Sequence, residues 1–512
     1  MLNFKRTQMK TKNISKLLML STLLFSSVSC TDLGETPVSI LVPDQYFKTA
    51  ADAEAAVMGI YSLLANADYY GRRLTMVLQL LGDDIDIADI GTQSSRIQIN
   101  GFTHDASNQD VVAIWKTAYL GIGAANAAID GIPKVEMDEN SKSALIAEAR
   151  LLRALNYYHL VQLFGDIPYI ANYVADPSTV MDINKTPAEQ VYENIILDCT
   201  YAIDNLPDTH QNDVRARPTK GSAHTLLASV YMILERWSDA AKQAQDVIAQ
   251  SSNYKYALVD DFQKLWKADL GYQSEHVWVV DFAGTISGEN SSNVDYTAPM
   301  TGVRDADMLG WSVLAPSQGI YASFSDQDYR KKVSFLTETP IKGVMTPYQK
   351  WRWPRIHTAK WCLYPGANAS AEGSNSDIKH VIFRYAEVLL IAAEALNEAN
   401  GGPTAEAYQY INAVRARARN TPEGQQEYPA DLQAGMSQQT FRDAVREERR
   451  IELAFEWKRW YDLKRWKMVP EAFKGAGSFE PHTNVQEHHA LLPIPQEEIG
   501  RNANLLPQNP GF

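Results

Sequence analysis

The stretch TKGSAHTLLASVYMILERWSDAAKQAQDVIAQ, residues 219–250, decides the fold class. Apolar side chains recur at helical spacing in two segments, 219–235 and 238–250, and Arg236 and Trp237 separate them. Recurrence every three to four residues is typical of helices that bury one face. The stretch therefore predicts two helices that fold back on each other as a hairpin.

The hairpin carries small and aromatic residues in the pattern of a tetratricopeptide repeat: Ala228, Tyr231, Trp237, Ala240 and Ala244. The 34-residue period of such repeats is not kept along the chain, so plain helical hairpins remain an alternative. The same helical periodicity is found at residues 50–66, 110–131, 140–164, 384–399, 404–419 and 438–467. We expect a mainly α protein in which helical hairpins stack into one tetratricopeptide-like superstructure.

Residues 252–380 have a different composition. Gly, Ser, Pro, Asn and Trp are frequent there, and the helical period is lost. A second loop-rich segment covers residues 67–109. Long loops on a rigid scaffold commonly carry binding function, so these two segments are where we expect a site.

The N-terminus reads as an export signal. Five basic residues precede an apolar run from Leu17 to Val28, which is too short to span a bilayer. Ser29 and then Cys30 follow, as in bacterial lipoproteins, where a cysteine directly after a small residue is acylated and the chain is cleaved before it. We therefore predict a lipoprotein signal peptide at residues 1–29 and a lipid-anchored tether at 30–47; the alternative is an ordinary signal peptide with a chance cysteine.

The charge excludes some partners. The chain has a formal net charge of −13, and loss of residues 1–29 removes five basic groups and no acidic one, which leaves about −18. Nucleic acids and anionic lipid surfaces are bound through basic patches, so neither is an expected partner. Nor does the sequence contain a nucleophile elbow, a phosphate-binding loop or a zinc-protease motif.

Two C-terminal segments resemble the signature of the SusD/RagB family, the nutrient-binding outer-membrane lipoproteins of Bacteroidota. They are VREERRIELAFEWKRWYDLKRW (445–466) and LLPIPQEEIGRNANLLPQNPGF (491–512). Four further blocks resemble family blocks in the same order: 148–169, 217–232, 310–324 and 384–399. The resemblance extends from about residue 40 to the C-terminus.

The resemblance implies one SusD-like domain over residues 48–512. It would consist of an N-terminal helical part (48–251), a loop-rich insertion (252–380) that forms an irregular C-terminal subdomain, and a C-terminal helical part with the tail (381–512). It also implies a lipid-anchored protein on the outside of a Gram-negative outer membrane. There it would capture an oligosaccharide, or less often a peptide, and deliver it to a TonB-dependent transporter. No catalysis is expected; a glycoside hydrolase is the enzyme alternative, and it would need two suitably spaced carboxylates.

Candidate ligand-binding residues follow from sugar chemistry, because sugar rings stack on exposed aromatic side chains. Trp311 lies in the block at 310–324, and Trp351 and Trp353 would share one face of an extended chain. Tyr69, Tyr70 and Arg72 belong to a loop that resembles a ligand-proximal loop of the family. Each aromatic residue has core packing as its alternative.

The densest acidic cluster contains Asp83 and Asp84, with Asp86 and Asp89 nearby. It could accept hydrogen bonds from sugar hydroxyls, hold a structural calcium ion or form a solvated loop, although it lacks the EF-hand pattern. His482, His488 and His489 have no zinc-ligand spacing around them and are expected at the surface. We expect no cofactor beyond a structural calcium ion.

Overall fold

The computed structural model describes residues 46–512, apart from residues 288–291, 309, 370–374 and 475–481. Residues Phe47–Phe512 form one compact unit. The predicted signal peptide, Cys30 and the tether up to residue 45 lie outside the described residues. Within the described part, no helix combines the length and the apolar character that a membrane crossing requires.

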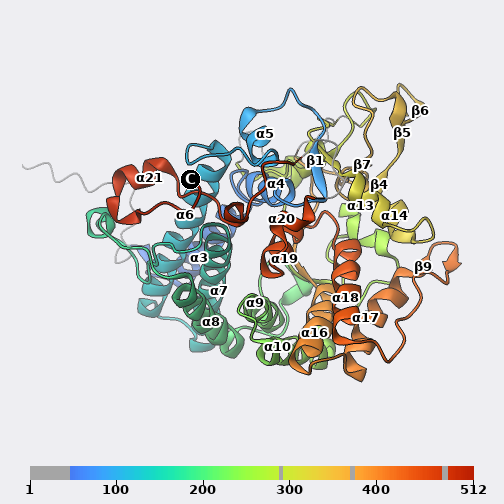
Figure 1. Ribbon diagram of the computed structural model, residues 1–512. Helices are drawn as coiled ribbons and strands as arrows, with labels where there is room; N and C mark the ends of the chain where they lie inside the picture. Colours follow the sequence, from blue (N-terminus) through green and yellow to red (C-terminus); the bar gives the residue numbers. More distant parts are fainter. Residues whose placement is uncertain (1–45, 288–291, 309, 370–374, 475–481) are drawn as a thin grey trace, which may run out of the picture. The chain divides into compact units, whose positions relative to one another are not determined.

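Nine helices form a series in which neighbours pack on one another in chain order (Figure 1). Successive contacts join α3 to α6, α6 to α7, α7 to α8, α8 to α9 and α9 to α10; α10 packs on α16, which contacts both α17 and α18. The helices are α3 (Ala50–Leu64), α6 (Gln109–Gly131), α7 (Glu139–Phe164), α8 (Ala188–Asn205), α9 (Lys220–Ile233), α10 (Trp237–Ala249), α16 (Tyr385–Ala399), α17 (Ala405–Ala418) and α18 (Gln438–Glu452). This arrangement confirms the predicted helical-hairpin fold.

The hairpin of α9 and α10 shows how the sequence specifies these pairs. Thr219 and Ser222 form a capping box that satisfies backbone N–H groups at the start of α9. On α10, the small side chains of Ala240 and Ala244 are fully buried, which lets this helix approach α9 and α16 closely. Small residues at contact positions therefore set the spacing of the series.

Short elements make up much of the remaining chain. The strands pair two by two, all antiparallel: β1 (Ile85–Ile87) with β3 (Leu314–Pro316), β2 (His276–Val280) with β8 (His380–Arg384), β4 (Phe335–Leu336) with β7 (His357–Thr358), β5 (Glu338–Ile341) with β6 (Val344–Pro347), and β9 (Asn420–Thr421) with β10 (Gly424–Gln425). The short α-helices are α4 (Arg73–Leu80), α5 (Ser94–Asn100), α11 (Ser251–Tyr254), α12 (Thr297–Thr301), α13 (Gln318–Ser323), α14 (Tyr329–Ser334), α15 (Ala359–Cys362), α19 (Arg459–Arg465), α20 (Val469–Ala472) and α21 (Gln496–Arg501). The β1–β3 and β2–β8 pairs connect segments far apart in the sequence.

The predicted single helix over 438–467 is wrong. Helix α18 ends at Glu452 and α19 begins at Arg459, because Phe455 and Trp457 adopt left-handed backbone conformations with φ of 67° and 52°. Such conformations are costly for bulky residues and persist where the surrounding structure demands them. Here the break leaves Glu456 buried, in contact with Lys360 from α15.

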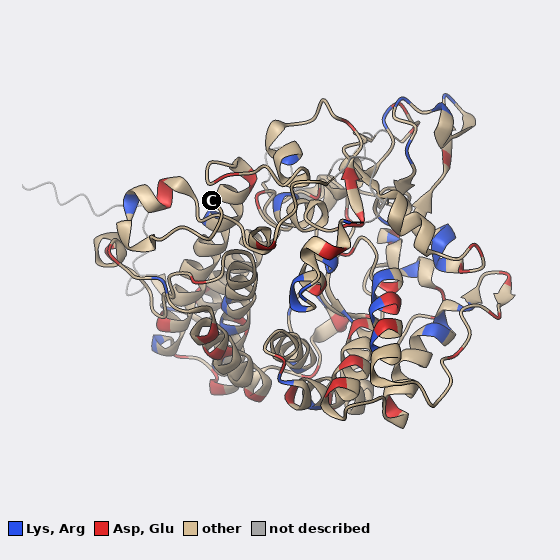
Figure 2. Cartoon of the chain, viewed as in Figure 1, with Lys and Arg blue, Asp and Glu red and all other residues tan. Residues whose placement is uncertain are grey.

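A buried charge network surrounds this break. The Glu452 carboxylate, which is 0 % exposed, lies 2.8 Å from an Arg330 nitrogen and 2.6 Å from an Arg384 nitrogen, and it also binds Arg417. Arg384 lies 2.6 Å from Glu275. Burial alone would raise the pKa of Glu452, but the three guanidinium charges outweigh burial and lower it. Figure 2 shows the acidic and basic residues alternating along α18, the helix that carries Glu452.

A second buried titratable group is His159 on α7. Its ring nitrogens lie 2.6 Å from the Tyr70 hydroxyl and 2.8 Å from the Tyr461 hydroxyl. Burial, with a smaller contribution from Lys458, lowers the pKa of His159 to about 3. The folded protein therefore holds this ring neutral.

This pKa predicts acid sensitivity. Below the unfolded value of about 6.5 the unfolded chain binds the proton and the folded chain does not, so stability should fall with pH from there toward the folded pKa of about 3. Between pH 7.5 and 5, His159 alone should account for a loss of about 2 kcal/mol. Urea unfolding at both pH values should show a smaller loss for His159→Gln, which cannot take up the proton. An equal loss of stability in the wild type and in His159→Gln would show that His159 is not the group responsible.

Candidate functional site

Two loops meet where the candidate site lies. The Tyr296 N–H donates a hydrogen bond of 2.8 Å to the Gly71 carbonyl. A Cβ at Gly71 would lie 2.3 Å from the Val294 carbonyl oxygen, so this approach requires glycine. The contact sets Tyr296 beside Arg72.

Arg72, Tyr296 and Trp311 form what we call the Tyr296–Trp311 stack. The Arg72 guanidinium carbon lies 5.1 Å from the Tyr296 ring centroid, and the centroids of Tyr296 and Trp311 are 5.6 Å apart with planes inclined by 34°. All three residues are half-buried, so part of each side chain contacts solvent. The main-chain N–H of Trp311 donates to the Pro299 carbonyl at 2.6 Å, which fixes the backbone that carries the indole. The stack thus offers an aromatic surface edged by a cation.

A second group, the Trp353 cluster, consists of Asp89, Arg304, Arg352 and Trp353. The guanidinium carbons of Arg304 and Arg352 lie 5.7 and 4.7 Å from the Trp353 ring centroid. Arg304 also pairs with Asp89 at 3.2 Å. The main-chain N–H of Arg304 donates to the hydroxyl of Ser312, which directly follows Trp311. The Trp353 cluster and the Tyr296–Trp311 stack therefore flank the same short segment.

Two further arginines, Arg73 and Arg96, belong to the loop-rich segment that contains Arg72. Arg73 binds Asp68 at 2.7 Å and also contacts Asp110. Arg96 on α5 is 7 % exposed; one of its terminal nitrogens donates to the Thr92 hydroxyl at 2.9 Å, while its Nε has no hydrogen-bond partner among the described residues. Burial lowers the pKa of Arg96, the charge of Asp110 raises it, and those of Arg72 and Arg73 lower it further.

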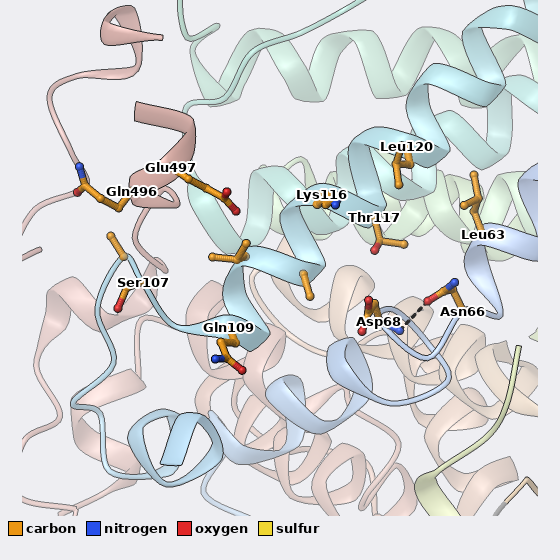
Figure 3. A pocket seen from close by; sticks show the side chains of 13 residues that line it. Leu63, Asn66, Asp68, Ser107, Gln109, Lys116, Thr117, Leu120, Gln496 and Glu497 are labelled. Carbon is orange, nitrogen blue, oxygen red and sulfur yellow. Dashed lines mark hydrogen bonds between the residues drawn. The ribbon is translucent and has the colours of Figure 1, made fainter. Parts of the chain in front are cut away.

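A separate groove of 770 Å³ lies along α6, between α21 and the turn at residues 66–68 (Figure 3). Apolar side chains including Leu63 and Leu120 line it, together with Asp68, Lys116 and Glu497. None of the described residues that line it is aromatic. Because aromatic faces pack well on the apolar faces of sugar rings, we favour the Tyr296–Trp311 stack over this groove as the ligand site.

Three predicted aromatic site residues are core residues instead. Tyr69 and Tyr70 are 0 % and 2 % exposed, so neither ring has a face available for a ligand. Trp351 is 5 % exposed, and its indole N–H donates to the Thr346 carbonyl at 2.9 Å. The chain bends at residues 351–353, so the two-residue alternation of an extended strand does not apply and only Trp353 is partly exposed. The prediction of ligand contact is therefore wrong for Tyr69, Tyr70 and Trp351.

The acidic cluster is engaged in ion pairs. Asp83 and Asp84 are buried and bind Arg450 at 3.1 and 2.9 Å, and Asp83 lies 2.5 Å from Arg459. Their oxygens therefore hold the 83–84 loop against the last helices, and the prediction that they accept hydrogen bonds from a ligand is wrong. Within the described ranges, no group of three or more His, Cys, Asp or Glu residues is placed to hold a metal ion.

The surface prediction for the histidines is wrong for two of them. His489 is 5 % exposed, and the His482 side chain is 3 % exposed and lies 2.9 Å from Asp86. The C-terminal tail covers His489: the Phe512 ring packs on it, with ring centroids 5.9 Å apart. His482 instead packs against Phe473, with ring centroids 5.2 Å apart. Sequence reasoning had no way to place these distant rings over the histidines.

Sequence reasoning did not identify Tyr296, Arg96, Arg304 and Arg352. One signal for Tyr296 was available, since it is the only aromatic residue between Phe282 and Trp311, in a loop rich in Ser and Asn. The arginines gave no comparable signal, because their proximity depends on how separate loops pack. Arg72, Trp311 and Trp353 are placed in the two groups described above, and their contact with a ligand stays a prediction.

Comparison with known proteins identifies the family. A protein from Formosa agariphila, SusD-like protein P2, is 43% identical over 503 residues, which cover 96% of this chain and 98% of that relative. The chain belongs to the SusD family. The SusD family model matches residues 340–512, and a model described as "Starch-binding associating with outer membrane" matches residues 43–232. The resemblance seen in the sequence is thereby confirmed.

Solved structures of SusD-family proteins share the fold. A SusD homologue from Bacteroides thetaiotaomicron has 27% sequence identity and a TM-score of 0.82, with 92% of this chain and 98% of that chain covered. A laminarin-binding SusD-like protein has 26% identity and a TM-score of 0.75, with 91% and 100% covered. The helical series and the loop-rich region of this chain are thus those of a SusD-family protein.

Proposed function

We propose that this protein is a non-catalytic binding protein that captures a glycan at the Tyr296–Trp311 stack. The observation that carries the proposal is the pair of partly exposed rings, 5.6 Å apart, with Arg72 at their edge. Aromatic faces pack on the apolar faces of sugar rings, while Arg and carboxylate groups at the edge bind hydroxyls. The laminarin-binding relative supports the same class of ligand.

The protein would act on the outer surface of the outer membrane and pass its ligand to a TonB-dependent transporter. The basic and apolar residues before Cys30 support export and lipid anchoring. The family description "Starch-binding associating with outer membrane" supports the location. Two or more acyl chains on Cys30 would make the anchoring stable.

The test is binding without turnover. Calorimetry of the purified protein against a panel of polysaccharides should give saturable binding to at least one class, and heat-denatured protein should give none. The same mixtures, incubated overnight, should release no reducing ends above background. Absence of binding across the panel would contradict glycan capture, whereas product release would make the protein an enzyme.

A further inference from the structure

The site contains more cationic than anionic side chains, although the whole chain is acidic. The ion pairs and ring contacts of the two groups join four arginines and three aspartates: Arg72, Arg73, Arg304 and Arg352, with Asp68, Asp89 and Asp110. The chain as a whole has a net charge of −13. The balance of charge in the two groups is thus opposite in sign to that of the whole chain.

Arg72 is less neutralised than Arg73 or Arg304. Arg73 and Arg304 pair with Asp68 and Asp89, at 2.7 and 3.2 Å. The Asp68 carboxylate lies 3.9 Å from Arg72, beyond hydrogen-bond distance, and it binds Arg73 more closely. A half-buried guanidinium that shares its counter-charge with a second arginine can bind a further anion.

We propose that the ligand of this site is an anionic glycan, whose carboxylate or sulfate group binds Arg72 while an adjoining sugar ring stacks on Tyr296 and Trp311. This inference rests on the proposed function and adds the class of glycan. A planar guanidinium donates two parallel hydrogen bonds to an oxyanion, which a neutral hydroxyl cannot match.

The Trp353 cluster would extend the same recognition to another part of the polymer. Its indole is flanked by Arg304 and by the exposed Arg352, so it repeats the pairing of an aromatic face with a guanidinium. Repeated pairing suits a polymer in which charged sugars recur. Uronic acids and sulfate esters supply the same oxyanion chemistry, and the experiment separates them.

The test uses polysaccharide pairs that differ in charge: polygalacturonate against its methyl ester, and dextran sulfate against dextran, with laminarin as a further neutral glycan. The purified protein should bind at least one anionic member at least tenfold more tightly than its neutral partner. Raising NaCl from 50 to 500 mM should weaken that binding, because salt screens charge pairs. The pair that shows the difference identifies carboxylate or sulfate as the recognised group.

Variants locate the effect. Arg72→Gln should lower affinity for the anionic polymer at least tenfold and leave neutral glycan binding nearly unchanged, whereas Arg72→Lys, which keeps the charge, should lose less. The matched control is Arg236→Gln on the helical scaffold, where Arg236 pairs with Asp239, and it should bind as the wild type does.

Provided that the protein binds a glycan, three outcomes would overturn the anionic preference alone: equal affinity for charged and neutral polysaccharides, preference for neutral ones, or an equal loss of affinity for charged and neutral polysaccharides in Arg72→Gln. Neutral glycan binding with no anionic preference would leave glycan capture standing. Failure to bind any glycan would overturn both glycan capture and the anionic preference. Binding confined to acidic peptides would overturn the same two proposals.

Discussion

Replacement of Glu452 by glutamine should lower the free energy of unfolding by about 3–5 kcal/mol. The carboxylate is fully buried and binds Arg330, Arg384 and Arg417, which approach it from three separate parts of the chain. Glutamine has nearly the same shape but no charge, so three buried guanidinium groups would lose part of their neutralisation. Loss of one partner from a buried ion cluster is costly because the remaining charges stay desolvated.

Urea unfolding monitored by tryptophan fluorescence and circular dichroism would measure this loss. Asp246→Asn is a matched control: the same carboxylate-to-amide change breaks the exposed pair with Lys242, and it should cost less than about 1 kcal/mol. A Glu452→Gln protein as stable as this control would show that the buried network contributes little to stability.

Replacement of Trp311 by alanine should weaken glycan binding by at least about 30-fold. The indole is half-buried beside Tyr296, so its removal takes away a large part of the stacking surface. Truncation of a central aromatic contact typically costs 2 kcal/mol or more, and each 1.4 kcal/mol is a tenfold change in affinity. The effect should appear for whichever polysaccharide the wild-type protein binds.

Calorimetry with that polysaccharide checks the expectation, and Trp237→Ala is the control. Trp237 is a half-buried tryptophan at the start of α10, on the helical scaffold, so its loss affects stability without touching the site. A Trp311→Ala protein that is folded and binds normally would exclude the Tyr296–Trp311 stack as the ligand site.

The sequence predicted the helical part of the fold well because its signals are local. The apolar periodicity of residues 219–250 and the small residues at 240 and 244 are sufficient to predict the α9–α10 hairpin. The break between α18 and α19 could not be predicted. No glycine or proline marks residues 453–458, and the left-handed residues there are stabilised by contacts with distant parts of the chain.

The site was predicted only in part, for a related reason. Sequence composition marks aromatic residues in loops but does not say which ring faces solvent. Trp351 and Trp353 are two residues apart, yet a bend buries the first and leaves the second partly exposed. Tyr69 and Tyr70 looked like a platform, but both rings are buried, and the Tyr70 hydroxyl binds His159 from α7. Exposure depends on tertiary packing, which a single sequence does not reveal.

The loops that carry the candidate site are attached through main-chain atoms. Tyr296 is held by a hydrogen bond from its N–H to the Gly71 carbonyl, and Trp311 by one from its N–H to the Pro299 carbonyl. Neither bond depends on the type of side chain that the position carries. A new specificity can therefore arise by exchange of side chains at these two positions, while the scaffold and the course of both loops stay as they are.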